Sequence, residues 1–343
     1  MKALVISQHG APVADLLEVI ADHPDPDVGP GEVLVRTHAS ALNHLDLWVA
    51  HGIPGIETVF PFISGSDGCG VVEEVGYGVD ESWVGRRVIV NAAVEVDDTP
   101  LPDQSPATPE IEMIGEHTNG CHGELFTAPV RNILDVGDAD PVAAAAYGLT
   151  HLTAWRMLVT RAGVAPGRRV LITGIGGGVA LAALGICHYL GCETIVTSRH
   201  QHKLDLAMER GATHGVLDTG QDFSKEVRRL TNRRGVDICV DSVGKAIHLS
   251  GLKSLARGGT LVTCGCTSGP DATTDLARLF WLQQTIAGST MGDMDEFRAS
   301  TALFLSGAIE PVVDSVYSPD QVQDAYRRLE SGDQFGKVVI DWR

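Results

Sequence analysis

The segment VLITGIGGGVALAAL, residues 170–184, decides the fold of this chain. Its first residues are apolar and β-branched, which predicts a buried parallel strand. A glycine-rich turn follows at 173–178, and a helical pattern of small and aliphatic residues begins at Val179. A strand, a glycine turn and a helix in this order form the context in which a glycine motif binds a dinucleotide. The segment therefore predicts a doubly wound α/β domain with a dinucleotide site.

Glycines are needed in such a turn because a Cβ would keep the backbone away from a pyrophosphate. The phosphates then lie at the helix N-terminus, where free N–H groups and the helix dipole favour negative charge. Two registers fit the pattern, one through Gly174 and Gly176 and one shifted through Gly177 and Ala180. An ordinary strand-to-helix turn is the alternative. The expected cofactor-binding residues of the turn are Gly174, Gly176, Gly177, Gly178 and Val179.

A second strand, TIVT at 194–197, ends about 20 residues beyond the glycine turn, where an NAD site has an acidic residue on the ribose. No carboxylate stands there; Ser198 and Arg199 do, and Lys203 follows one helical turn later. A guanidinium and a hydroxyl suit a 2′-phosphate. The pattern favours NADP(H) over NAD(H), the alternative being that Arg199 is a solvated surface residue.

The composition bounds the class of protein. The chain has 343 residues, enough for two domains, and a formal net charge of −18, which disfavours nucleic acid and anionic membranes as partners. The charge indicates either an acidic surface or adaptation to high salt. The seven cysteines form no C-x-x-C pair, which predicts free thiols in a reducing compartment. With no membrane-length apolar segment and no signal-peptide pattern at the N-terminus, we expect a cytoplasmic protein.

Residues 1–145 contain many short strands without helices between them, which predicts a barrel-like β domain. The proline-rich segment 97–109 is expected to be a surface loop. From residue 146 strands and helices alternate, as in a parallel sheet. The tail 298–343 loses this rhythm and is assigned to the first domain.

Several stretches in order are shared with one known family: GPGEVLVR (29–36), ALNHLDLW (41–48), GSDGCGVVEEVG (65–76), DSVG (241–244) and FGKVVI (335–340). Through them the chain resembles the medium-chain dehydrogenase/reductase superfamily, and in particular its quinone oxidoreductase-like and zinc-type alcohol dehydrogenase-like members. The resemblance implies an α/β protein with a GroES-like β-barrel catalytic domain (1–145 and 298–343) and a Rossmann domain (146–297). It also implies a homodimer or homotetramer formed through an edge strand near 280–290.

The chain departs from the zinc enzymes of this family at each ligand position. Asn43 stands at the position of the first cysteine ligand, Ser66 at that of the histidine and Leu149 near that of the second cysteine. Asn, Ser and Leu side chains cannot form a tetrahedral N/S zinc site. The four-cysteine lobe of the structural zinc is replaced by the cysteine-free segment 97–109. We therefore expect neither a catalytic nor a structural zinc.

Without zinc, the resemblance implies transfer of hydride from NADPH to a small-molecule quinone or α,β-unsaturated carbonyl. Asn43 is expected to donate from its amide to the substrate oxygen, and Asp46, three residues later, to orient Asn43 or His44. His44 and His51 are candidate proton donors. The alternatives are an alcohol or aldehyde dehydrogenase and a non-catalytic NADPH-binding protein.

The resemblance places further residues at the cofactor. Lys337 either reaches the cleft from the last strand or lies on the surface. Thr153 is expected at the nicotinamide amide, Asp241 and Ser242 near the riboses, and Cys264 and Gly265 against the nicotinamide.

Overall fold

The computed structural model describes residues 1–96 and 110–343, so the segment 97–109 lies outside the described residues. The chain forms two compact units. Unit 1 contains residues 1–149, 293–305 and 313–343, and unit 2 contains residues 150–292 and 306–312. Within the described chain no helix is both long enough and apolar enough to cross a membrane.

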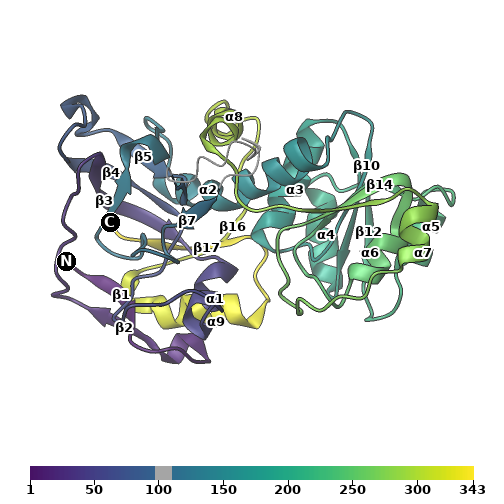
Figure 1. The fold of residues 1–343 in the computed structure, drawn as a ribbon, viewed down its shortest axis with the longest axis horizontal. Helices are drawn as coiled ribbons and strands as arrows, with labels where there is room; N and C mark the ends of the chain where they lie inside the picture. The colour runs from purple at the N-terminus through teal and green to yellow at the C-terminus, as the bar shows by residue number, and fades with distance from the viewer. Residues whose placement is uncertain (97–109) are drawn as a thin grey trace. The chain divides into compact units, whose positions relative to one another are not determined.

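Unit 2 is built on a parallel sheet with the strand order β12-β11-β10-β13-β14-β15 (Figure 1). This is the doubly wound order in which a dinucleotide binds where the order reverses, beside β10. Helices cover both faces of the sheet. The strands are β10 (Arg169–Ile172), β11 (Glu193–Ser198), β12 (His214–Leu217), β13 (Val236–Asp241), β14 (Leu255–Thr263) and β15 (Thr285–Gly288). The helices are α3 (Gly178–Tyr189), α4 (Gln201–Glu209), α5 (Ser224–Leu230), α6 (His248–Ser254) and α7 (Leu276–Trp281).

Unit 1 is organised by a sheet with the order β16-β17-β3-β4-β5-β9, in which β8 also pairs with β3. Two smaller pairs, β1 with β2 and β6 with β7, complete it. Its strands are β1 (Ala3–Ile6), β2 (Leu17–Ile20), β3 (Glu32–Ala41), β4 (Gly68–Val75), β5 (Arg87–Val90), β6 (Ala93–Glu95), β7 (Ile111–Met113), β8 (Leu125–Pro129), β9 (Ile133–Asp135), β16 (Val313–Tyr317) and β17 (Lys337–Asp341). Its helices are α1 (His44–His51), α8 (Met294–Leu305) and α9 (Val322–Ser331), while α2 (Pro141–Trp155) begins in unit 1 and ends in unit 2.

The core of unit 1 forms where α1 and α9 pack against β1 and β17. Helix α9 buries Val322, Ala325, Tyr326 and Leu329, which recur every three to four residues and so lie on one face of the helix. They share a cluster with apolar residues of α1 and with Val338 of β17. This packing fixes the position at which β17 enters the sheet.

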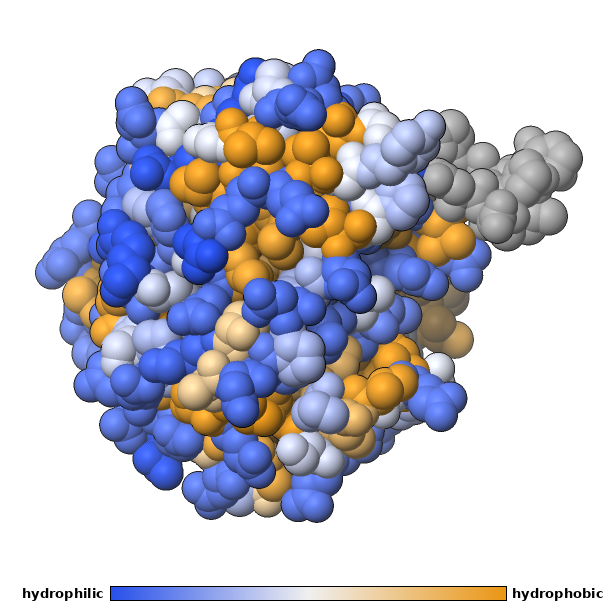
Figure 2. Space-filling view, turned by 90° about the vertical axis from the view of Figure 1, so that its left-hand side faces the viewer, coloured by the Kyte–Doolittle hydropathy of each residue, from blue (hydrophilic) through white to orange (hydrophobic). Residues whose placement is uncertain are grey.

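The α/β class with a GroES-like and a Rossmann domain is confirmed by this architecture. The extent of the domains differs in detail from the expected division at 145/146 and 297/298. Residues 306–312, expected in the first domain, belong to unit 2. The physical reason is Ile309, which is buried and approaches Gly185 of α3. Figure 2 shows one face of the molecule, on which hydrophilic residues surround several apolar patches, the broadest of them in the upper centre of the view.

Candidate active site and cofactor-binding turn

Three segments far apart in the sequence meet at the ends of three neighbouring strands, β17, β3 and β4, in the large sheet of unit 1. Strand β17 runs antiparallel to β3, and the Leu42 N–H donates to Val338 O at 2.9 Å. On the other side of β3, the Ala41 N–H donates to Asp67 O at 3.2 Å. The pairing thereby brings together the second residue after β3, the residue before β4 and the first residue of β17. They are Asn43, Asp67 and Lys337.

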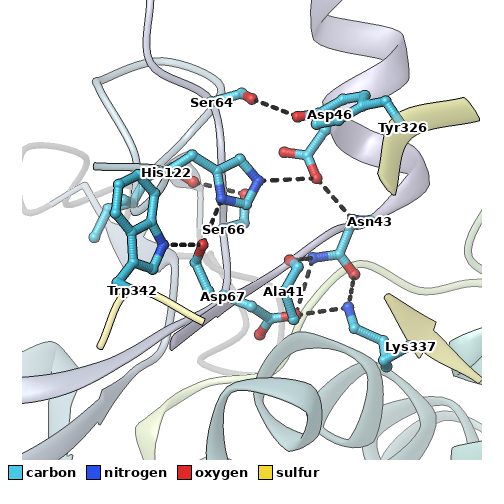
Figure 3. A network of polar contacts seen from close by, with 12 residues as sticks. Ala41, Asn43, Asp46, Ser64, Ser66, Asp67, His122, Tyr326, Lys337 and Trp342 are labelled. Atoms are coloured by element: carbon cyan, nitrogen blue, oxygen red, sulfur yellow. Dashed lines mark hydrogen bonds and ion pairs between the residues drawn. The ribbon is translucent and has the colours of Figure 1, made fainter. Parts of the chain in front are cut away.

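These three side chains form a buried polar cluster, which we call the Asn–Asp–Lys cluster (Figure 3). Lys337 Nζ lies 2.5 Å from Asn43 Oδ1 and 2.9 Å from Asp67 Oδ2. Asn43 Nδ2 donates to Asp67 Oδ2 at 2.9 Å and to Ala41 O at 3.3 Å. The residues are 6 %, 1 % and 4 % exposed, in chain order. Lys337 is thus not a surface lysine, and both amide hydrogens of Asn43 already have acceptors within the protein.

The carboxylate of Asp67 is also held by helix α2. The Leu149 N–H donates to Asp67 Oδ1 at 2.6 Å. The preceding residue, Gly148, has no side chain, and a Cβ there would lie 2.4 Å from the same oxygen. Glycine in a helix costs stability, so its presence here is explained by the close approach of Asp67. The carboxylate charge is therefore shared among an ammonium, an amide and a backbone N–H.

The positions that carry zinc ligands in related enzymes do not fit a zinc ion here. The Ser66 hydroxyl is buried and donates to Ile114 O at 2.7 Å. The Asn43 carbonyl oxygen faces the Lys337 ammonium, a cation that would repel a metal ion. In the part of the chain that the structure describes, no three His, Cys, Asp or Glu side chains form a group able to hold a metal. The expectation of no zinc remains a prediction, supported by this donor set.

The two other expected catalytic residues lie in the first turn of α1. Asp46 is buried, and its Oδ2 accepts the Asn43 N–H at 2.7 Å, so this carboxylate caps the helix and fixes the Asn43 backbone. The His44 side chain is exposed, next to the Asn–Asp–Lys cluster in sequence. Desolvation by the surrounding protein lowers the pKa of His44, and the Lys337 charge lowers it further, whereas Asp46 raises it.

Asp46 also lies next to a group of polar side chains, those of His122, Ser40 and Trp342. The sequence analysis did not predict this contact. His122 Nδ1 lies 2.8 Å from Ser40 Oγ, which also accepts the Trp342 Nε1–H at 2.9 Å. On its other side, His122 Nε2 faces Asp46 Oδ2 (Figure 3). A signal for this packing exists in Gly65, where a Cβ would lie within 3 Å of the His122 ring.

In unit 2 the glycine turn has the backbone geometry that favours glycine. Gly174 has a φ of +65° and Gly176 a φ of +117°, whereas Gly177 caps α3 with a φ of −75°. The Ile175 N–H donates to Thr197 O at 2.8 Å, which fixes the turn over the end of β11. The left-handed residues are those of the register through Gly174 and Gly176. A Cβ at Gly177 would meet only Gly174 O, at 3.8 Å, so there is room at the start of α3, and phosphate binding by Gly174, Gly176, Gly177, Gly178 and Val179 remains a prediction.

Asp241, expected near the ribose, is fully buried at the end of β13. Its carboxylate accepts the Thr173 hydroxyl at 3.1 Å and the Val243 N–H at 2.8 Å. Burial raises the pKa of Asp241, although these hydrogen bonds oppose the rise. The structure thus places Asp241 beneath the glycine turn as its support. Ser242 follows it and is half-buried.

The residues expected at the 2′-phosphate lie around the end of β11. Ser198 is buried, and its hydroxyl accepts the His200 N–H at 3.1 Å. Arg199 is exposed, and Lys203 is buried in α4. The remaining expected contacts lie elsewhere in unit 2. Thr153 is buried in α2, and Cys264 and Gly265 are half-buried after β14, where burial raises the pKa of the Cys264 thiol to about 12.

Comparison with known proteins covers almost the whole chain. Residues 29–138 match the alcohol dehydrogenase GroES-like domain family, and residues 178–306 match the zinc-binding dehydrogenase family. A zinc-type alcohol dehydrogenase-like protein, YogA, of Leptosphaeria maculans is 31 % identical over 92 % of each chain. A crotonyl-CoA reductase of Streptomyces avermitilis is 28 % identical over 91 % of this chain and 80 % of its own. The crystal structure of an NAD-dependent alcohol dehydrogenase is similar over 100 % of each chain, with 36 % identity and a TM-score of 0.92.

Proposed function

Since the chain belongs to the medium-chain dehydrogenase/reductase superfamily and is an NAD(P)H-dependent oxidoreductase, we propose that it reduces a conjugated carbonyl compound, a quinone or an α,β-unsaturated carbonyl, with NADPH. The observation that carries the proposal is the Asn–Asp–Lys cluster. The cluster contains the positive charge of Lys337 beside Asn43, the position that the family resemblance assigns to the first zinc ligand, and this supports the proposal.

The chemistry of this substrate class suits such a cluster. When bound, NADPH supplies the hydride. Conjugation spreads the negative charge that then develops on the substrate, so hydrogen-bond donors stabilise it without a metal ion. A saturated alcohol or aldehyde has no such conjugation and depends more on a Lewis acid. The residues present therefore favour the conjugated substrate.

The proposed roles of the expected catalytic residues follow from their contacts. The direct donor role expected for Asn43 is not the one that the geometry favours, because both its amide hydrogens have acceptors. Asn43 instead positions Lys337, and Asp46 fixes the Asn43 backbone. His44 is exposed, and the charge of Lys337 lowers its pKa. An exposed imidazole near the cluster suits a proton donor to the product.

The preference for NADPH rests on the end of β11. No carboxylate follows this strand directly, and Ser198 and Arg199 stand where a 2′-phosphate would need a hydroxyl and a cation. Thr153, Asp241, Ser242, Cys264 and Gly265 complete the proposed cofactor site within unit 2. NADH is the alternative, because a similar solved structure is that of an NAD-dependent alcohol dehydrogenase.

Among the relatives, the crotonyl-CoA reductases favour the enone reaction, since a crotonyl group is an α,β-unsaturated carbonyl. The alcohol dehydrogenases favour the alternative, oxidation of an alcohol or reduction of an aldehyde. The deciding experiment measures NADPH and NADH oxidation with quinones, enones, enoyl thioesters and aldehydes, on protein whose zinc content has been assayed. Turnover of quinones or enones by zinc-free protein is expected. Turnover of aldehydes alone by protein with stoichiometric zinc would contradict the proposal.

We further propose that the protein forms a homodimer through β15. This strand pairs only with β14 among the described strands and leaves its other edge open. The adjacent helix α7 exposes Leu276, Phe280 and Trp281, each about 70 % accessible. An open strand edge beside an exposed apolar patch is typical of an interface.

A further inference from the structure

The Lys337 side chain keeps one donor that nothing in the protein uses. An ammonium has three hydrogens, and in the described structure its acceptors are Asn43 Oδ1 at 2.5 Å and Asp67 Oδ2 at 2.9 Å. The third hydrogen has no acceptor among residues 1–96 and 110–343. Since Asn43 has no amide hydrogen left, Lys337 is the member of the Asn–Asp–Lys cluster that still has a donor to offer.

We propose that the Lys337 ammonium is the catalytic group that binds the carbonyl oxygen of the substrate. This role rests on the proposed function and names the residue that replaces the metal ion in it. The cluster is buried, so the charge acts in a medium of low dielectric constant, where it stabilises an oxyanion more strongly than it would in water. Asn43 and Lys337 keep an exposure of 6 % and 4 %, and the next residue in the chain after Asn43, His44, is exposed.

The negative charge of Asp67 does not cancel the stabilisation of the substrate oxyanion by Lys337. The Asp67 carboxylate also accepts from the Asn43 amide and from the Leu149 N–H, so its negative charge is compensated by three donors and not by Lys337 alone. Its contacts hold the ammonium in one position before the substrate arrives. A donor fixed in advance stabilises the transition state without the cost of reorienting a flexible side chain.

The step balances as follows. The hydride that bound NADPH would supply, leaving NADP⁺, forms a C–H bond at the β-carbon of the enone. The π pair of the C=C bond moves between the α-carbon and the carbonyl carbon, and the π pair of the C=O bond moves onto the oxygen, which gives an enolate. The third Lys337 hydrogen stays on nitrogen and forms a hydrogen bond with this enolate oxygen. A proton from water, relayed by His44, then adds to the α-carbon and gives the saturated carbonyl. For a quinone the same donor faces the oxygen that becomes the phenolate.

The test compares Lys337→Met with the double variant Lys337→Met/Asp67→Asn. The single variant leaves the buried Asp67 carboxylate without its cation, so a loss of activity could reflect a failure to fold. The double variant avoids this problem because it removes both charges of the pair. We expect both to lower kcat about 100-fold or more while the dissociation constant of NADPH, measured by fluorescence titration, changes less than threefold. Lys225→Met, at an exposed lysine of α5, is the matched control and keeps full activity.

The outcomes separate the possible roles. Recovery of activity in the double variant would show that Lys337 only neutralises Asp67 and would overturn the proposal. An unchanged kcat with weakened NADPH binding would assign Lys337 to the cofactor and would overturn it as well. If wild-type protein reduced no quinone or enone, the proposed function would fail first and this role with it. If the wild type reduced quinones or enones and the double variant kept that activity, only the role of Lys337 would be refuted.

Discussion

His122 Nε2 lies 3.6 Å from Asp46 Oδ2, and both side chains are completely buried. This contact is too long for a hydrogen bond, and the neighbouring groups favour one tautomer of His122. Because Trp342 Nε1 can only donate to Ser40 Oγ, the Ser40 hydroxyl is free to donate its own hydrogen to His122 Nδ1. The other ring nitrogen then carries its hydrogen toward the Asp46 carboxylate. A histidine distant in sequence thus supports the residue that fixes Asn43.

We predict that His122→Phe destabilises the protein by about 2 kcal/mol, because it removes the hydrogen bond to the buried Ser40 hydroxyl and the polar neighbour of Asp46. Urea unfolding followed by tryptophan fluorescence measures the change. His51→Phe, the same substitution at an exposed position of α1, is the control and is expected to change stability by about 0.5 kcal/mol or less. A loss at His122 no larger than that of the control would show that the histidine does not hold Asp46.

The fold was predictable because its signals are local. The strand, turn and helix around residues 169–189 follow one another in the sequence, and the carboxylate three residues after Asn43 caps the same helix. The Asn–Asp–Lys cluster depends instead on contacts between residues 270 and 294 positions apart. They meet only because β17 pairs with β3 in one register, and no local pattern encodes that pairing. For this reason the position of Lys337 stayed open and the role of His122 was missed.

The glycine turn offers a test of phosphate binding that does not disturb the backbone. Gly177 has an ordinary φ, and a Cβ there would have only one atom nearby, Gly174 O at 3.8 Å. Gly177→Ala should therefore leave stability unchanged but weaken NADPH binding about tenfold or more, because the methyl group occupies the space of the pyrophosphate. Fluorescence titration measures the affinity. Gly288→Ala, where a Cβ meets nothing, serves as the control, and equal affinities in the two variants would place the phosphates elsewhere.

Arg199 is exposed directly after β11, in a position to reach a 2′-phosphate. Arg199→Ala should raise the KM for NADPH about tenfold or more and leave the KM for NADH nearly unchanged, since only NADPH carries the phosphate that the guanidinium would bind. Steady-state kinetics with both cofactors measures this ratio. Arg210→Ala, at an exposed arginine after α4, should alter neither value. A similar rise for both cofactors would remove Arg199 from phosphate recognition.

The pKa of His44 is lowered by desolvation and by the Lys337 charge, so its imidazole is neutral at pH 7. A proton donor acts in its protonated form, and the rate it supports is therefore highest below its pKa and falls as the pH rises through that value. We predict that kcat falls with rising pH with a midpoint below 6.5, the ordinary value for histidine. His44→Gln should abolish this dependence, whereas His51→Gln should keep it. A profile that His44→Gln leaves unchanged would assign the proton to another group.

The exposed face of α7 and the open edge of β15 predict how two copies associate. A two-fold axis beside β15 would pair the strand with its own copy in antiparallel orientation and bury Phe280 and Trp281 from both chains. Trp281→Glu places a charge in that interface, and sedimentation velocity should then show a shift from a dimer to a monomer of 36.4 kDa. Tyr77→Glu, at an aromatic residue of unit 1 that is more exposed than Trp281, should remain dimeric. A wild-type monomer, or a dimer that Trp281→Glu does not disturb, would exclude this surface as the interface.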